Sequence, residues 1–235
     1  MKNPARFPWL LKLTRERFPL SSAKNDYSFG EELANSITHG IGTALSIAGL
    51  VVLVVLGALY GTAWHVVSFS IYGATLILLY LASTLYHSFR SERLKSIFKV
   101  IDHASIYILI AGTYTPFMLI SLRGPWGWSI FGTIWGLAIA GIIFKVFLIG
   151  RFKKLSLMIY LIMGWLCVIA FREMFLRIPI GGIIWLGLGG IFYSLGVIFY
   201  AWKNLPYGHA IWHLFVLAGS IFQYLAVLFY LIPRQ

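Results

Sequence analysis

The stretch GHAIWHLFVLAGSIFQYLAVLFYLIP, residues 208–233, contains no Asp, Glu, Lys or Arg. A helix crosses the hydrocarbon core of a bilayer with roughly 20 predominantly apolar residues, so this run is long enough to span a membrane. It nevertheless begins with His209 and His213, which lie four positions apart and therefore on one face of a helix. The stretch thus indicates a transmembrane helix with a polar site at its start.

The rest of the chain repeats this apolar pattern. Of its 235 residues, 60% are hydrophobic and only 11% are charged, whereas about a quarter of the residues in a soluble domain are charged. Seven runs are candidates for spanning helices, namely 36–59, 64–88, 101–121, 126–149, 155–172, 182–202 and 208–232. The sequence therefore predicts an all-α integral membrane protein, with a seven-transmembrane helix bundle over residues 31–235 and a basic tail at 1–30.

The basic residues are distributed unevenly between the two ends of these helices. Fifteen of the 19 Lys and Arg lie in the N-terminal tail or near the connections that follow the second, fourth and sixth runs. On the other side lie only Arg123, Arg172, Arg177 and Arg234. The positive-inside rule then predicts a cytoplasmic N-terminus and an outside C-terminus for a multi-pass protein of the cell inner (plasma) membrane. Since membrane orientation explains the net charge of +12, we expect no nucleic acid partner.

The tail contains the segment RFPWLLKLTRERF, residues 6–18, which mixes basic residues with Trp and Leu. Such a segment can lie along the inner leaflet with its apolar face in the membrane. It can equally be an unstructured basic tail, and the sequence leaves both interpretations open.

Polar and ionisable residues gather at the cytoplasmic ends of four predicted helices. They are Glu32, Asn35 and His39 at the start of the first, Ser83 and His87 at the end of the second, Asp102 and His103 at the start of the third, and the His209–His213 pair of the seventh. Five of the six histidines thus share one membrane depth, and only His65 falls on the other side. An ionisable group at membrane depth costs about 2.5–3.5 kcal/mol on insertion scales, so such a cluster usually marks a functional site.

A shared metal ion would offset the cost of these clustered imidazoles. His209 and His213 could ligate one ion, and His87 could supply a third nitrogen. Three histidines that leave a fourth position open are typical of catalytic zinc. Imidazole also suits copper, iron and nickel, but three neutral nitrogens without a thiolate fit zinc best. We expect Asp102 to orient or deprotonate a water and Ser83 to hydrogen-bond a substrate carbonyl or Asp102, which together form a hydrolytic set.

Each of these residues also has a simpler interpretation. A histidine at a helix end is usually an interfacial residue, and Ser83 within a helix usually bonds back to a carbonyl group of its own helix. Asp102 suits a helix N-terminus because of the helix dipole, and Glu32 with Asn35 could be capping residues. The occurrence of all of them at one depth favours the metal site.

The motifs also resemble those of a known family. Glu-x-x-Asn-x-x-x-His at 32–39, Ser-x-x-x-His at 83–87, Asp102 and His-x-x-x-His at 209–213 are similar, in this order, to motifs of the hemolysin III proteins. These proteins are the bacterial branch of the progestin and adipoQ receptor (PAQR) family, which is distantly related to alkaline ceramidases. The likeness covers roughly residues 29–232.

The resemblance implies a seven-helix bundle with a cytoplasmic N-terminus and a zinc ion held by His87, His209 and His213. It also implies that Asp102 engages the ion through water and that Ser83 lies beside the ligands or faces the substrate. It gives no role for the first motif, 32–39.

The sequence departs from the family pattern in two places. About 30 residues stand where the animal receptors have a large cytoplasmic domain, which argues against signalling through such a domain. Gln223 stands where many hemolysin III proteins have His, but it lies more than two turns beyond His213 and so too far along the helix to share the ion.

Three functions remain open at this stage. The first is a zinc hydrolase that acts on a lipid amide or ester reached from within the bilayer, so that membrane lipid is its expected partner. The second is a receptor-like or regulatory membrane protein in which the zinc only holds helices together. The third is a membrane-permeabilising cytolysin, which the pattern of seven apolar runs favours least.

Overall fold

The structure is a computed structural model, and it describes residues 27–148 and 152–233. Residues 1–26 of the predicted basic tail, with the amphipathic segment 6–18, lie outside the described residues. In chain order the elements are α2 (Phe29–Tyr60), α3 (Ala63–Ser88), α4 (Glu92–Pro116), η1 (Phe117–Ser121), α5 (Pro125–Leu148), α6 (Lys153–Gly164), η2 (Leu166–Ala170), α7 (Phe171–Arg177), α8 (Ile180–Ala201) and α9 (Gly208–Tyr230).

Seven of the described helical segments are long and apolar enough to cross a membrane, which confirms the predicted seven-helix membrane fold. The first begins at Phe29 rather than at 36, because Ser28 and Glu31 form a capping box. The Glu31 N–H donates to Ser28 Oγ at 3.3 Å, and the Ser28 N–H donates to the Glu31 carboxylate at 2.8 Å. Similarly, α4 begins at Glu92 rather than at 101, since a helix continues through polar residues that a count of apolar residues leaves out.

The fifth span is longer than the predicted 155–172 and is not a regular helix. It runs through α6, η2 and α7, and it takes 3-10 geometry over Leu166–Ala170. The hydroxyl group of Tyr114, on α4, lies 2.9 Å from the carbonyl oxygen of Met163 and accepts the N–H of Cys167 at 2.9 Å. A side chain inserted between the partners of a helical hydrogen bond interrupts the helix, so Tyr114 accounts for this break.

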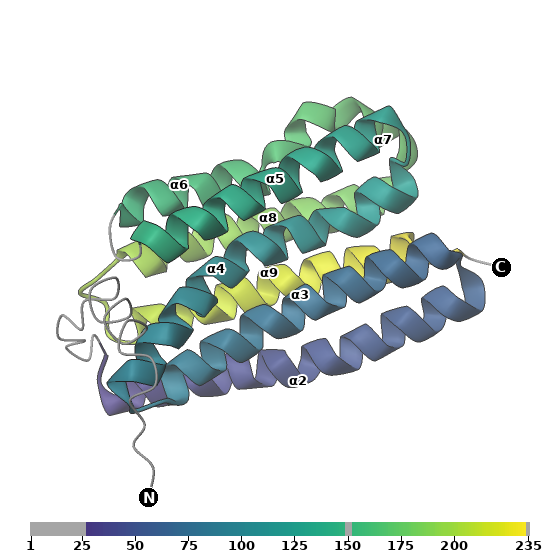
Figure 1. The fold of residues 1–235 in the computed structure, drawn as a ribbon. Helices are drawn as coiled ribbons and strands as arrows, with labels where there is room; N and C mark the ends of the chain where they lie inside the picture. The colour runs from purple at the N-terminus through teal and green to yellow at the C-terminus, as the bar shows by residue number, and fades with distance from the viewer. Residues whose placement is uncertain (1–26, 149–151, 234–235) are drawn as a thin grey trace, which may run out of the picture.

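The helices lie side by side along one direction, and α2 begins at the end of the bundle opposite to the end of α9 (Figure 1). Neighbours in the chain pack against each other, and α2 also packs against α9. α3 and α4 form the interior, because 72% of the most apolar stretch of the third span is buried, against 17% for the sixth. The outer helices expose apolar side chains such as Ile41, Ile139 and Ile184, as a surface in contact with lipid requires.

The close approach of α3 and α4 depends on Gly112. A Cβ atom at this position would collide with the side chain of Thr75 on α3. Small residues let neighbouring helix backbones come close together in membrane proteins. Gly136 on α5 is different, because among the described residues no atom lies within 4 Å of a Cβ placed there.

The charged residues separate along the bundle axis. We call the end at which α2, α4 and α9 begin, and at which α3 and α5 end, the basic end. In the described part of the chain it carries Arg90, Arg93, Lys95, Lys99, Lys145, Lys154 and Lys203, whereas the opposite end carries Arg123, Arg172 and Arg177. The cytoplasmic location of the basic end stays a prediction from the positive-inside rule.

Candidate metal centre

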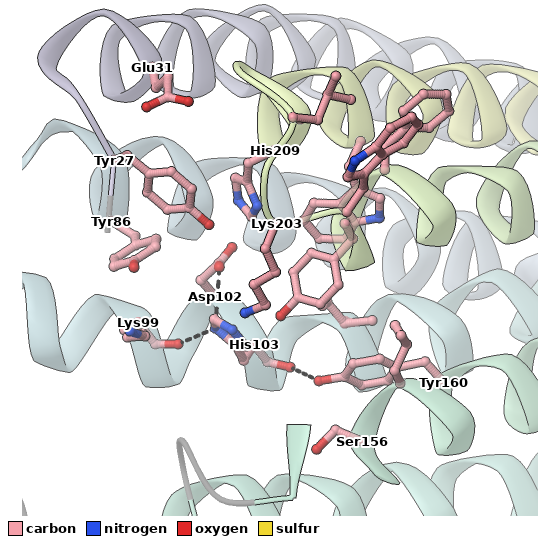
Figure 2. A pocket seen from close by; sticks show the side chains of 18 of the residues that line it. Tyr27, Glu31, Tyr86, Lys99, Asp102, His103, Ser156, Tyr160, Lys203 and His209 are labelled. Atoms are coloured by element: carbon pink, nitrogen blue, oxygen red, sulfur yellow. Dashed lines mark hydrogen bonds and ion pairs between the residues drawn. The ribbon is translucent and has the colours of Figure 1, made fainter. Parts of the chain in front are cut away.

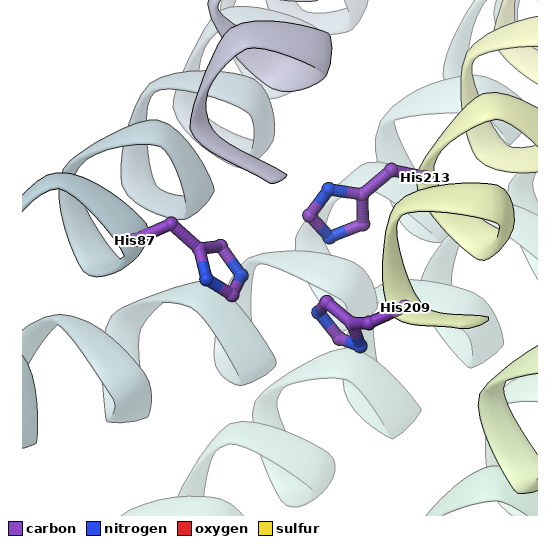
Figure 3. Close-up of side chains that lie close together, drawn as sticks. All are labelled: His87, His209 and His213. Carbon is purple, nitrogen blue, oxygen red and sulfur yellow. The ribbon is translucent and has the colours of Figure 1, made fainter. Parts of the chain in front are cut away.

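Three histidines from two helices converge at the basic end (Figure 3). His87 lies in the last turn of α3, while His209 and His213 lie one turn apart at the start of α9. One ring nitrogen from each lies within 4.8 Å of the other two, and His87 and His213 are buried. Across the described residues, these three form the one group of His, Cys, Asp or Glu that could hold a metal ion. The structure therefore brings together the three histidines that the sequence predicts as metal ligands.

α2 orients two of these rings through their Nδ1 atoms. The Nδ1 of His87 lies 2.6 Å from Oε2 of Glu32, and the Nδ1 of His213 lies 3.3 Å from the backbone oxygen of Asn35. Carboxylate and carbonyl oxygens only accept hydrogen bonds, so in both rings Nδ1 carries the proton and Nε2 keeps its lone pair. The Asn35 amide also lies 3.5 Å from Nδ1 of His87, but the shorter contact to Glu32 dominates.

The free lone pairs fit a metal ion. The Nε2 atoms of His87, His209 and His213 are all buried and have no hydrogen-bond partner. A buried polar atom without a partner costs about 1–3 kcal/mol, and three of them in one place are explained if they share a cation. A metal-ligating histidine usually donates its other N–H to a carboxylate or a carbonyl oxygen, and His87 and His213 make hydrogen bonds of this kind.

Glu32 is itself held from a third helix. Its Oε1 atom accepts a hydrogen bond from the ammonium group of Lys95 on α4, so the carboxylate links His87 to α4. The sequence predicted Lys95 only as one of the charges that orient the protein, and the simpler interpretation of Glu32 was a helix cap, a task that Ser28 and Glu31 perform instead. No signal in the sequence distinguishes this lysine from its neighbours, because its role depends on how α2 packs against α3 and α4.

Asp102 lies beside the three ligands rather than among them. It is buried on α4, is not part of the group that could hold the ion, and shares a cavity wall with His209. The Ser83 hydroxyl is near its carboxyl group but is buried without a hydrogen-bond partner. Asp102 and His209 thus line the same cavity, and contact of Asp102 with a metal-bound water stays a prediction.

His103 lies next to Asp102 within α4. Its Nδ1 donates to the backbone oxygen of Lys99 at 2.7 Å and lies 3.5 Å from Oδ2 of Asp102 (Figure 2). Its own backbone oxygen accepts the hydroxyl group of Tyr160, from α6, at 2.9 Å. His103 thus faces Asp102 and ties α4 to α6, and it is not a member of the ligand group.

His39 packs against the site without belonging to the ligand group. Its ring is stacked on that of His213, with centroids 3.5 Å apart and planes 12° apart, and it meets the Tyr80 ring edge-on. Both ring nitrogens of His39 are buried without a partner. His65 lies at the opposite end, as the sequence predicts, where its Nε2 donates to the backbone oxygen of Leu231 at 3.1 Å.

Two cavities share part of their walls, including Asp102. A polar cavity of about 250 Å³ opens at the basic end, and its wall includes His209 together with lysine and tyrosine side chains. An apolar cavity of about 130 Å³ lies between α4, α6, α8 and α9, and Gln223 is part of its wall. The residues that line both cavities are Asp102, Ile106, Leu157, Tyr160 and Trp212.

Comparison with known proteins agrees with these motifs. Residues 27–224 match the model of the family described as "Haemolysin-III related". The chain belongs to this family. This haemolysin-III-related protein is 52% identical over 203 residues to "Hemolysin-3" of Bacillus cereus, covering 86% of this chain and 93% of that protein. It is 51% identical over 204 residues to "Hemolysin-3 homolog" of Bacillus subtilis, covering 87% and 96%.

A more distant relative is found in animals. The chain is 31% identical over 207 residues to "Monocyte to macrophage differentiation factor" of Homo sapiens, covering 86% of this chain and 84% of that protein. Because that protein belongs to the PAQR family, the predicted resemblance to hemolysin III proteins and to the wider PAQR family is confirmed. The range 27–224 that matches the family includes every site residue described above.

Proposed function

We propose that this haemolysin-III-related protein is a zinc-dependent hydrolase of lipid amides or esters. The observation that carries the proposal is the convergence of three imidazoles, each with a buried Nε2 atom that has no hydrogen-bond partner, together with a polar cavity that His209 and Asp102 both line. We further propose that the site lies near the cytoplasmic face of the cell (plasma) membrane, because it lies at the basic end.

The donor set supports zinc and an open site. Three neutral imidazoles without a thiolate suit zinc, and three protein ligands leave a fourth position, as in catalytic rather than structural zinc sites. Zinc held there would supply Lewis-acid polarisation of a carbonyl oxygen and lower the pKa of water.

The residues of the chain have separate tasks in this proposal. Glu32 and the backbone oxygen of Asn35 hold the ligand rings in place. Asp102 accepts a proton from the water that attacks the carbonyl carbon and returns it to the leaving amine or alcohol. Ser83 donates a hydrogen bond to the carbonyl oxygen of the substrate or to Asp102. The apolar cavity holds the hydrocarbon chain and keeps bulk water away from the reacting bond.

The first test is the metal content of detergent-purified protein, measured by mass spectrometry. We expect about one zinc per chain in the wild type and loss of zinc in the His209→Ala/His213→Ala double variant. His65→Gln is the matched control, because it removes a histidine from the opposite end of the bundle. A well-folded wild type that contains no metal would exclude the zinc site and the hydrolase with it.

The second test separates catalysis from structure. With lipid amides and esters as substrates, Asp102→Asn should retain the metal and lose turnover, since Asp102 is outside the ligand group. If the wild type binds zinc but Asp102→Asn turns over as fast as the wild type, Asp102 is not the base.

A structural role for the metal is the second candidate, and one observation favours it. The three histidines come from α3, which packs mainly against α2 and α4, and from α9, which packs mainly against α8. An ion would therefore add a further direct link between α3 and α9, beside the hydrogen bond that the Tyr80 hydroxyl group donates to Ser220. If the metal is structural, His209→Ala should lower Tm, whereas Asp102→Asn should not lower it.

The third candidate is a cytolysin, which the name of the Bacillus cereus relative suggests. Leakage from liposomes that persists after chelation would support it.

A further inference from the structure

The wall of the polar cavity carries an excess of positive charge. Lysines from three parts of the chain line it, namely Lys99 of α4, Lys145 of α5 and Lys203 of the connection between α8 and α9. Figure 2 shows the Lys203 side chain extending toward His103 and Asp102. Two carboxylates also line the cavity, so the three ammonium groups outnumber them even before a metal ion is bound.

One of these carboxylates is already engaged in local structure. Glu31 accepts the backbone N–H of Ser28 at 2.8 Å through Oε2 and that of Tyr207 at 3.0 Å through Oε1. It thereby caps α2 and fastens the start of α9. Asp102, the other carboxylate, lines both the polar and the apolar cavity.

Lys145 is the most informative of the three lysines. A lysine that serves only to orient a membrane protein extends its ammonium group toward water or lipid headgroups, as the exposed Lys154 does at the same end of the bundle. Lys145 instead is only 4% exposed, and its ammonium group lies over the Tyr160 ring, 5.8 Å from the centroid. Burying an ammonium group is costly, so the positive-inside rule does not explain this position.

We propose that the polar cavity binds the phosphate group of a phosphorylated lipid, and that such lipids are the substrates of the metal centre. This proposal rests on the proposed hydrolase function and narrows its substrate class. Lysine ammonium groups bind phosphate as point charges, and three of them around one cavity suit a group with several charged oxygens. Arginine binds carboxylate and phosphate groups alike through a bidentate geometry. The described wall of the cavity contains no arginine.

The shared wall of the two cavities favours a lipid over a soluble phosphate ester. Asp102 and Tyr160 line both, so one molecule can place its phosphate among the lysines and its chain in the apolar cavity. Its amide or ester group then falls near Asp102, between headgroup and chain. A lysophospholipid or an N-acylated phospholipid has this order of groups.

Binding to the zinc-loaded full-length protein in detergent tests the proposal, with native mass spectrometry as the readout. The probes are lysophosphatidic acid, monoacylglycerol of the same chain length, and glycerol 3-phosphate. We expect the wild type to bind lysophosphatidic acid more tightly than monoacylglycerol. Lys145→Gln should weaken lysophosphatidic acid binding by roughly 10-fold, since one charged interaction is lost. Monoacylglycerol binding should not change.

Two further variants keep the test decisive. Lys203→Gln changes an exposed residue of the cavity wall and should also weaken lysophosphatidic acid binding, even if Lys145→Gln does not fold. Lys154→Gln is the matched control and should bind like the wild type. Equal affinity for the two lipids, or an equal loss in Lys154→Gln, would overturn the phosphate site. Binding of glycerol 3-phosphate as tight as that of the lipid would overturn the lipid source.

The test distinguishes this inference from the proposed function. If neutral lipid amides are hydrolysed with no preference for phosphorylated lipids, the hydrolase stands and the phosphate site falls. If phosphate-selective binding occurs but no lipid is hydrolysed, the phosphate site stands and the hydrolase falls.

Discussion

Replacing Glu32 with glutamine should weaken metal binding without removing a ligand. One carboxylate oxygen of Glu32 accepts the N–H of His87 at 2.6 Å, and the other accepts a hydrogen bond from Lys95. Glutamine keeps the shape of the side chain but loses the charge, so it stabilises the Nδ1 proton less and makes Nε2 less basic. Loss of such a partner typically costs 10–100-fold in metal affinity, which corresponds to about 1.4–2.7 kcal/mol.

The assay is competition for zinc between the purified full-length protein and a chromophoric chelator. Glu31→Gln is the matched control, because this neighbouring carboxylate makes its hydrogen bonds to Ser28 and Tyr207. Zinc affinity should fall in Glu32→Gln and stay at the wild-type value in Glu31→Gln. A zinc affinity of Glu32→Gln within about twofold of the wild type, or an equal loss in Glu31→Gln, would refute the role of the carboxylate.

Three more predictions follow from the packing and the ligand set. His39→Phe should retain zinc and Tm, because it keeps the stacked ring and removes two unpartnered nitrogens. If mass spectrometry shows that this variant has lost zinc, His39 is a ligand. Gly112→Ala should destabilise the protein by about 1–3 kcal/mol through its clash with Thr75, while Gly136→Ala should leave thermal unfolding unchanged; equal effects would contradict the packing argument. Acidification from about pH 8 to about pH 5 should release the metal, because protons compete with it for the imidazole nitrogens of histidine, whose ordinary pKa is about 6.5. Dialysis at each pH followed by metal analysis measures the release. Metal content that stays constant would argue against histidine ligands.

Hydropathy and spacing were sufficient to predict the seven spans and the three histidines that meet. Membrane spans can be predicted because each must be apolar over its own length, whatever its neighbours are. Successive spans alternate in direction, so the end of the second span and the start of the seventh lie on the same side of the membrane. His87 and the His209–His213 pair could therefore be predicted to lie at the same membrane depth. The polar first turns before 36 and 101 were missed because they carry no apolar signal.

Other features depend on contacts between distant helices and could not be predicted. The break in the fifth span comes from the Tyr114 hydroxyl group on another helix. The tasks of Glu32 and Asn35 require α2 to pack against both ligand-bearing helices. Lys145 and Lys154 look equivalent in a charge count, and only packing shows that the first faces a cavity.

The separation of the ligands along the chain has a consequence for biosynthesis. His87 belongs to the second span and the other two ligands to the seventh, so α9 emerges from the ribosome after α2–α8. A nascent chain that has inserted only its first six spans offers one ligand and cannot retain the ion. In the proposed metal site, the ion can therefore be held only after the seventh span has been inserted, and an occupied site would report that the seven spans are in place.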